Sequence, residues 1–165
     1  MALIPPPNTR PPRDAHRIDE AKLARWLRDN VEGCTGGKMT VLQFKGGQSN
    51  PTYWIGIEGA DEGDTALVLR KKPPGKLLPS AHAVEREYRV MRALRGTAVP
   101  VPEALASCED DSVIGTPFFV MRCVPGRIFW DPTLPELASN EARRAVYKEY
   151  VRVLAALHAV DYAAV

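Results

Sequence analysis

The sequence predicts an α+β fold built around an antiparallel sheet. Three consecutive segments alternate apolar and polar residues with a period of two, and a helix-like spacing of apolar residues precedes and follows them. Two further strand-like segments come before a final helical pattern. Because strands do not alternate strictly with helices, a doubly wound parallel sheet is not expected. The 165 residues, 45% of them apolar, suffice for one folded core.

Composition argues against several classes of protein. The formal net charge is +2, without the basic excess of a nucleic-acid or membrane-surface binder, so neither kind of partner is expected. No apolar run is long enough to span a membrane, and the N-terminus lacks the apolar core of a secretory signal. The three cysteines show no CxxC spacing, which indicates free thiols in a reducing compartment and a cytoplasmic location.

The N-terminal third is expected to hold a tail and a helix. Residues 1–17 form a proline-rich tail, whose residues 1–13 are predicted to be extended or disordered. A helix is predicted from about Asp19 to residue 32, with Gly33 as its stop. Its apolar residues recur at helical spacing, at Ile18, Leu23, Trp26, Leu27 and Val31.

The three period-two segments predict a meander of strands at residues 39–45, 52–58 and 65–71. They are rich in β-branched and aromatic residues and are joined by short polar turns. Residues 72–79 contain three prolines and therefore cannot form a central strand or a helix.

The second half of the chain predicts two helices and two strands. Ser80 is expected to cap a helix that runs to about Arg95 and ends at Gly96. Strands are predicted at 104–108 and 118–123, separated by a polar turn at 109–112. The last helix is expected to begin at Ser139 or Asn140 and to end near Val160. Its apolar face is formed by Val146, Tyr150, Val153, Leu154 and Leu157.

The segment Gly46 to Thr52, GGQSNPT, is the first candidate for chemistry. Paired glycines let backbone N–H groups approach a phosphate, and the hydroxyl groups of Ser49 and Thr52 add donors. The alternative is a plain hairpin turn between two strands.

Two charged residues could act together with this loop. Alternation along residues 65–71 places Arg70 on the face opposite Leu69 and Lys71. Glu87 lies on or beside the apolar stripe of the following helix, where a carboxylate needs a cationic partner, and Arg70 is a ready one. Glu85 is expected to face the arginines of its own helix. The alternatives are a solvated strand end for Arg70 and a local ion pair for Glu87.

The order of these features is more specific than any one of them. A glycine loop between the first two strands, a cation on the third and an acid on the next helix follow one another as in the nucleotide lobe of kinases. The chain resembles the aminoglycoside phosphotransferase family, which has a protein-kinase-like fold. The resemblance spans residues 40–161 and rests on FKGGQSNPTY, LVLRKKPPG, VEREYRVMRALRG, VPVPEAL, FFVMRCVPGRIF and LHAVD. It is nearest to the kinase-like domain fused to some acyl-CoA dehydrogenases.

The resemblance implies roles at matching positions on the phosphate side of an ATP site. Gly47, Gln48 and Ser49 would form a flap over the phosphates of ATP. Arg70 would contact the α- and β-phosphates, and Glu87 would pair with it. The family often has lysine at the position of Arg70, and arginine keeps the charge and can bind phosphate bidentately.

The resemblance also implies an adenine site and a division of the chain. Met121 would lie at the back of the adenine pocket, and the backbones of Arg122 and Val124 would bond the adenine edge as a hinge. Residues 18–124 would form the nucleotide-binding N-lobe, with a five-stranded antiparallel sheet and helix C. Residues 125–165 would leave the hinge and begin a truncated C-lobe.

The family's catalytic chemistry resides in that second lobe, where an HGD…N motif supplies the base and metal ligands. His158 to Asp161 is not that motif, so no catalytic or metal-binding residue is expected in this chain. The chain alone is therefore expected to be inactive, with its own C-lobe as partner and with Mg²⁺ bound there.

Three functions remain open on the sequence. The first is an ATP-dependent kinase acting on a small-molecule hydroxyl, which the nearer branch suggests is a hydroxyacyl-CoA. The second is a non-catalytic nucleotide-binding or pseudokinase-like interaction module. The third is a structural domain without a nucleotide site.

Overall fold

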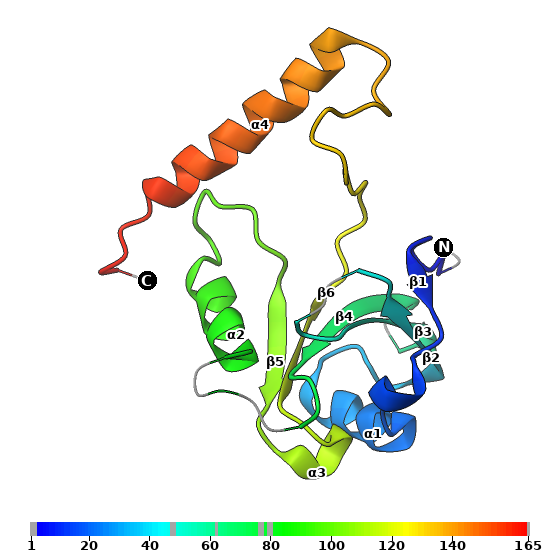
Figure 1. The fold of residues 1–165 in the computed structure, drawn as a ribbon. Helices are drawn as coiled ribbons and strands as arrows, with labels where there is room; N and C mark the ends of the chain where they lie inside the picture. The colour runs from blue at the N-terminus through cyan, green and yellow to red at the C-terminus, as the bar shows by residue number, and fades with distance from the viewer. Residues whose placement is uncertain (1–2, 47–48, 62, 76–77, 79–80, 165) are drawn as a thin grey trace. The chain divides into compact units, whose positions relative to one another are not determined.

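Six antiparallel strands form one sheet in the order β1-β2-β3-β4-β6-β5 (Figure 1). The computed structural model describes residues 3–46, 49–61, 63–75, 78 and 81–164. The strands are β1 (Thr9–Arg10), β2 (Gly36–Phe44), β3 (Thr52–Ala60), β4 (Thr65–Lys71), β5 (Ala104–Cys108) and β6 (Phe118–Arg122). The helices are the short 3-10 helix η1 (Asp14–His16), α1 (Glu20–Asn30), α2 (Val84–Ala93), α3 (Asp111–Ile114) and α4 (Asn140–His158). The predicted α+β class is confirmed.

The chain divides into two compact units. The first comprises Met1–Arg92 and Pro102–Cys123 and contains the whole sheet. The second comprises Ala93–Val101 and Val124–Val165 and contains α4. None of the helices in the described ranges has the length and apolar character that crossing a bilayer requires.

The predicted meander is present as β2, β3 and β4, paired through two antiparallel ladders. β2 begins three residues earlier than the predicted Met39, because Gly36 pairs with Ala60 at the far end of β3. Gly37 makes this extension possible: its φ is +76°, and a Cβ there would lie 2.4 Å from the carbonyl oxygen of Glu58.

The prediction of five strands is wrong, because the N-terminal tail supplies a sixth. Thr9 and Arg10 of β1 pair with Gln43 and Phe44 of β2, and the Lys45 N–H donates to the carbonyl of Asn8 at 2.8 Å. The three residues between the two proline runs keep their N–H groups, so this short piece can pair with an otherwise open edge. The described part of the tail is thus extended, and the alternative of disorder does not hold for it.

Backbone and side-chain contacts of Arg13 and His16 secure this tail to the sheet. The Tyr53 hydroxyl donates to the carbonyl of His16 at 2.7 Å, and the amide of Gln43 lies 2.8 Å from Nδ1 of the same histidine. The Arg13 N–H also donates to Gln43 Oε1 at 3.2 Å. Tyr53 is fully buried and Gln43 nearly so, which makes these contacts part of the packed structure.

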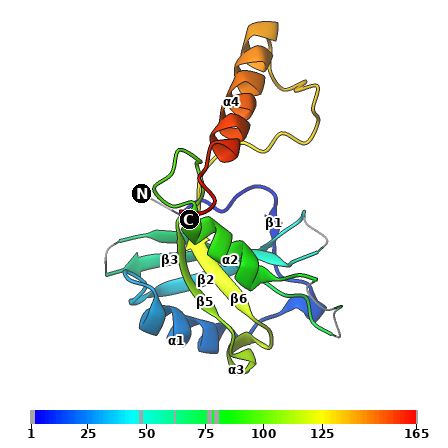
Figure 2. The same ribbon diagram turned by 90° about the vertical axis from the view of Figure 1, so that its left-hand side faces the viewer.

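Helices cover both faces of the sheet (Figure 2). α1 and α3 pack on one face, over the main apolar core, where the rings of Trp26 and Phe118 meet edge to face at 4.7 Å. α2 packs on the other face, where Tyr88 lies 5.9 Å from the ring of Phe119 and donates a long hydrogen bond of 3.5 Å to the carbonyl of Leu105.

The start of α2 and the segment 109–112 differ from the prediction. α2 begins at Val84, and the predicted cap Ser80 lies outside the described residues. The residues just before α2 form a turn that contains His82 at φ +57°. Part of the predicted turn at 109–112 is instead the start of helix α3, because the Asp110 side chain caps Ser112 N–H and Gly115 ends the helix in the left-handed conformation.

The second unit is built on α4. Ser139 caps it by accepting from Ala142 N–H, as predicted, and it ends at His158, two residues before the predicted end. Leu134 and Leu137 are buried beside its first turns, where Arg143 Nε donates to the Leu134 carbonyl at 3.1 Å. Within α4 itself no residue is buried, so the predicted apolar face is exposed at Tyr150, Leu154 and Leu157.

Candidate functional site

The side chains of β4 divide between the two faces of the sheet as alternation predicts. Leu67 and Leu69 are fully buried in the core beneath α1. Lys71 points to the same face and is only 4% exposed, with its Nζ 3.5 Å from the carbonyl of Ile114. Burial lowers the pKa of Lys71. Arg70 points to the opposite face, toward α2.

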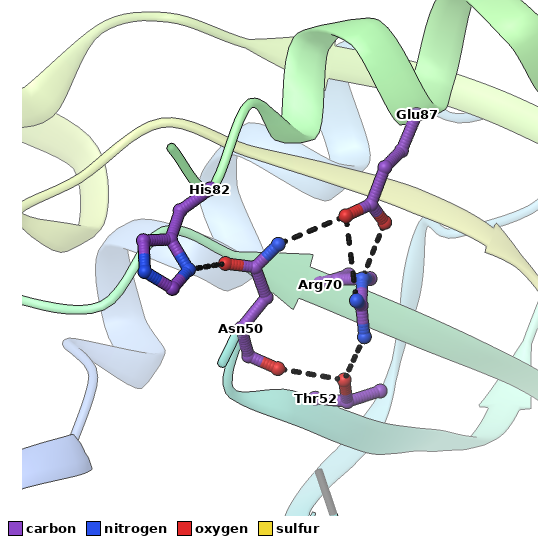
Figure 3. Close-up of polar contacts among 5 residues, drawn as sticks. All are labelled: Asn50, Thr52, Arg70, His82 and Glu87. Atoms are coloured by element: carbon purple, nitrogen blue, oxygen red, sulfur yellow. Dashed lines mark hydrogen bonds and ion pairs between the residues drawn. The ribbon is translucent and has the colours of Figure 1, made fainter. Parts of the chain in front are cut away.

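Arg70 and Glu87 form the expected ion pair between β4 and α2 (Figure 3). Arg70 Nε donates to Glu87 Oε2 at 2.5 Å, and Nη2 donates to Oε1 at 3.3 Å. This two-pronged contact fixes the plane of the guanidinium group. The two side chains keep 30% and 37% of their surface exposed, so a ligand has access to the pair.

Arg70 is also held from β3. Its Nη1 donates to Oγ1 of Thr52 at 3.1 Å, and Thr52 stands directly opposite Arg70 in the β3–β4 ladder. Three of the five N–H groups of the guanidinium are thereby engaged, and the other two bond no residue that the structure describes. These two groups could bind the oxygens of an anionic ligand.

A second ion pair joins α2 to Lys72, the residue that directly follows β4. Lys72 Nζ lies 3.1 Å from Oε1 and 3.0 Å from Oε2 of Glu85. Burial acts to raise the pKa of Glu85, but hydrogen bonds to its own backbone and to Lys72, with the charges of Lys72 and Arg89, outweigh it, and the pKa is lowered. The prediction that Glu85 faces the arginines of its own helix therefore missed its contact with Lys72, which directly follows β4.

Two residues that the sequence did not assign to the site complete it. Asn50, 4% exposed, donates from Nδ2 to Glu87 Oε1 at 2.9 Å. Its Oδ1 lies 2.9 Å from Nδ1 of His82 (Figure 3). Asn50 belongs to the glycine segment Gly46 to Thr52, so the sequence motif could have pointed to it. Nothing in the local sequence pattern points to His82.

The flap over the phosphates remains a prediction. Gly47 and Gln48 lie outside the described residues, and the following Ser49 is exposed. The chain then turns into the site, since Asn50 is buried and the Thr52 hydroxyl donates to the carbonyl of Asn50 at 3.1 Å.

The expected adenine side of the site has an apolar floor. Met121 of β6 stands opposite Val68, which in turn stands opposite Trp54, so all three share the face that carries Arg70. The Arg122 N–H is taken by the carbonyl of Glu103 at 2.9 Å, and Val124 is exposed. The hinge roles of Arg122 and Val124 stay predictions.

Metal chemistry finds no support among the described residues. No group of three or more histidine, cysteine, aspartate or glutamate side chains converges there as a metal site would require. The carboxylates of Glu85 and Glu87 are each engaged with a cation instead.

The sheet, the helix α2 and the Arg70–Glu87 pair define the nucleotide-lobe architecture of protein-kinase-like phosphotransferases. Comparison with known proteins agrees. The model of the phosphotransferase enzyme family matches residues 40–165, and the chain belongs to this family. A crystal structure from Ralstonia eutropha named "putative aminoglycoside phosphotransferase" is similar, with a TM-score of 0.72 and 47% identity over 90% of this chain and 40% of that one.

Curated proteins that are similar in sequence are named as acyl-CoA dehydrogenase family members. Acyl-CoA dehydrogenase family member 10 of mouse is 49% identical over 94% of this chain and 14% of its own length. Acyl-CoA dehydrogenase family member 11 of chicken is 46% identical over 94% of this chain and 19% of its own length. The chain thus spans less than a fifth of the length of each of these two relatives.

Proposed function

We propose that this chain is the nucleotide-binding lobe of an ATP-dependent phosphotransferase that phosphorylates a hydroxyl group of a small molecule. The observation that carries the proposal is the Arg70–Glu87 pair, which keeps part of its surface exposed and contacts Asn50 and Thr52 of the glycine-loop segment. A cation fixed in this way presents N–H groups to phosphate oxygens without first having to be ordered.

In this proposal each residue has a binding role. Arg70 contacts the α- and β-phosphates with the N–H groups that no described residue engages, and Glu87 holds its guanidinium plane. Gly47, Gln48 and Ser49 cover the phosphates, while Met121, Arg122 and Val124 border the adenine. ATP supplies the phosphoryl group, and the residues of this chain position the nucleotide for its transfer.

The catalytic base and the Mg²⁺ ligands belong, in this proposal, to the second lobe that family members carry. The matched relatives are named acyl-CoA dehydrogenases, which favours a hydroxyacyl-CoA as the phosphoryl acceptor. A cytoplasmic location accords with three cysteines that form no disulfide.

The proposal is tested by titrating the protein at its natural length with ATP and Mg²⁺ in a calorimeter. We expect saturable binding that Arg70→Ala weakens by at least about tenfold, since a hydrogen-bonded charge pair with phosphate is lost. Lys38→Ala, an exposed lysine on β2, serves as the control and should bind like the unmodified protein.

The outcomes separate the possible functions. Binding that is saturable but never followed by turnover, with any small-molecule alcohol or hydroxyacyl-CoA, would favour the non-catalytic interaction module. No binding at all would leave only a structural domain. Equal binding in Arg70→Ala would contradict the role proposed for Arg70 in the nucleotide site.

A further inference from the structure

We propose that Asn50 is a positioning residue that locks the phosphate-binding cation to the glycine loop, and that His82 orients Asn50 for this task. The inference rests on the proposed function, because it assigns how the same nucleotide site is held. It depends on four contacts that join β3, β4, α2 and the turn before α2.

The contacts of Asn50 close a ring. Its side chain donates to Glu87 Oε1, which also accepts from Arg70 Nη2. Arg70 Nη1 donates to Thr52 Oγ1, and the Thr52 hydroxyl donates to the carbonyl of Asn50 itself. The ring therefore passes from the side chain of Asn50 through the ion pair and back to its backbone (Figure 3).

The direction of every bond around Asn50 follows from the groups that meet there. An ionised carboxylate only accepts, so the amide must turn its NH₂ toward Glu87. Oδ1 then faces His82, whose Nδ1 must carry the hydrogen in order to donate at 2.9 Å. An amide turned the other way would place its oxygen against the carboxylate of Glu87. Because Asn50 is only 4% exposed, water could not compensate for this unfavourable contact.

His82 is held in an unusual conformation to make this contact. Its φ of +57° lies in the left-handed region, which side-chain-bearing residues seldom adopt. Such backbone strain persists where surrounding contacts outweigh it. The Val84 N–H donates to the His82 carbonyl at 2.9 Å, so the same residue that orients Asn50 also leads into the first turn of α2 and hence to Glu87.

The consequence concerns the loop. Asn50 stands in the glycine segment Gly46 to Thr52, and its side chain bonds Glu87 of helix α2. Asn50 and Thr52 are thereby held in place relative to the guanidinium of Arg70. Loss of the bond to Glu87 should therefore weaken the recognition of phosphates and leave recognition of the nucleoside unchanged.

The test compares ATP with adenosine as ligands of the protein at its natural length. In Asn50→Ala we expect the dissociation constant for ATP to rise about tenfold, the factor that corresponds to one lost hydrogen bond to a charged group, and that for adenosine to stay the same. Asn50→Asp matches asparagine in size, yet it should bind ATP more weakly still, because it places a second carboxylate against Glu87.

His82→Gly provides a second variant that should fold without difficulty, since glycine accepts a positive φ. It removes only the donor that orients Asn50, and ATP binding should weaken several-fold with no change for adenosine. The matched control is Asn30→Ala at the end of α1, on the opposite face of the sheet, where the side chain donates to the Trp26 carbonyl.

The results distinguish the inference from the proposed function. If the unmodified protein binds ATP and Arg70→Ala does not, but Asn50→Ala and His82→Gly bind ATP normally, the positioning role is overturned while the proposed function stands. Equal weakening of ATP and adenosine would show general loss of structure and would also overturn it. If the unmodified protein binds no ATP, both fail.

Discussion

The contacts of Arg70 require the several N–H groups of a guanidinium. It bonds both oxygens of Glu87 and also the hydroxyl of Thr52, from three different nitrogens. Lysine carries its charge on a single nitrogen and cannot hold a planar, bidentate geometry. Lysine at position 70 would therefore not be equivalent to arginine in this site.

Arg70→Lys should consequently retain some ATP binding but less than the unmodified protein. We expect an affinity between that of the unmodified protein and that of Arg70→Ala, because the charge is kept while the bidentate contact is lost. Calorimetric titration of all three proteins under one set of salt conditions provides the measurement. Affinity in Arg70→Lys equal to that in Arg70→Ala would show that charge at this position contributes nothing.

Lys71 shows the cost of burying a cation without an acidic partner among the described residues. Its pKa is lowered by burial, so the folded state binds fewer protons than the unfolded chain near and below the usual value of 10.5. Folding therefore carries a penalty that is complete below the lowered pKa and disappears as the pH rises to about 10.5.

Lys71→Met should stabilise the protein by about 1 kcal/mol at pH 7, since it replaces a buried charge with an apolar chain of similar length. The gain should shrink as the pH rises from the lowered pKa of the native lysine toward 10.5, because the native lysine then loses its proton. Urea unfolding at several pH values tests this. A gain that stayed constant over that range would rule out charge burial as its cause.

Tyr53 contributes a pH dependence in the opposite direction. Burial raises the pKa of its phenol from 10.0 to about 12. The folded state then holds the proton where the unfolded state has released it, so the contribution is complete below pH 10 and is lost as the pH rises toward 12.

Tyr53→Phe should lower the stability at neutral pH by about 1 kcal/mol, because the hydrogen bond to the His16 carbonyl is lost. It should also reduce the fall in stability between pH 10 and pH 12. Unfolding by urea, followed at pH 7 and across the alkaline range, is the measurement. An unchanged alkaline transition in the variant would assign that transition to other groups.

At the scale of elements, the face formed by β4 and α2 is held by two parallel ion pairs. Arg70 on β4 pairs with Glu87, and Lys72, which directly follows β4, pairs with Glu85. Both acids lie in the first turn of α2. The first pair is open to a ligand and the second is more buried. We interpret the second pair as the structural support that keeps the helix in register while the first binds phosphate.

The N-terminal segment is the other element with a clear role. β1 occupies the edge of β2 with only two residues, and prolines on both sides prevent further pairing. It thereby closes an edge that would otherwise be available to another chain.

Removal of residues 1–12 should uncover this edge. We expect faster amide hydrogen exchange at the outer N–H groups of β2 and concentration-dependent association, because the ladder to Thr9 and Arg10 is lost. Hydrogen exchange and light scattering provide the measurements, with β5 at the other edge as the internal reference. Unchanged exchange in β2 together with a monodisperse solution would contradict the role assigned to β1.

At the scale of the whole molecule, the described structure comprises a complete sheet unit and a second unit around α4. The chain covers 40% of the similar crystal structure, and the family to which it belongs is one of phosphotransferases. The sheet unit contains the residues proposed to bind nucleotide phosphate, while the acceptor and the transfer chemistry belong to the proposal for the whole protein.

The local pattern of the sequence determined most elements. Period-two alternation predicted β2, β3 and β4, and two further strand-like segments predicted β5 and β6. The predicted bounds of β4 and β5 agree with the structure to the residue. Alternation also placed Arg70 and Lys71 on opposite faces, since neighbouring residues of a strand always point apart. The contact of Arg70 with Glu87 followed because an acid on an apolar helix face needs a cation nearby.

Only the tertiary structure decided the contacts between distant segments. The pairing of β1 with β2, the position of α1 over the core, the contact of Lys72 with Glu85 and the link from His82 through Asn50 to Glu87 all join residues from separate elements. Periodicity reports which face a residue occupies within its own element. Which partner it meets depends on strand register and on where the chain returns, and these are settled by packing of the whole sheet unit.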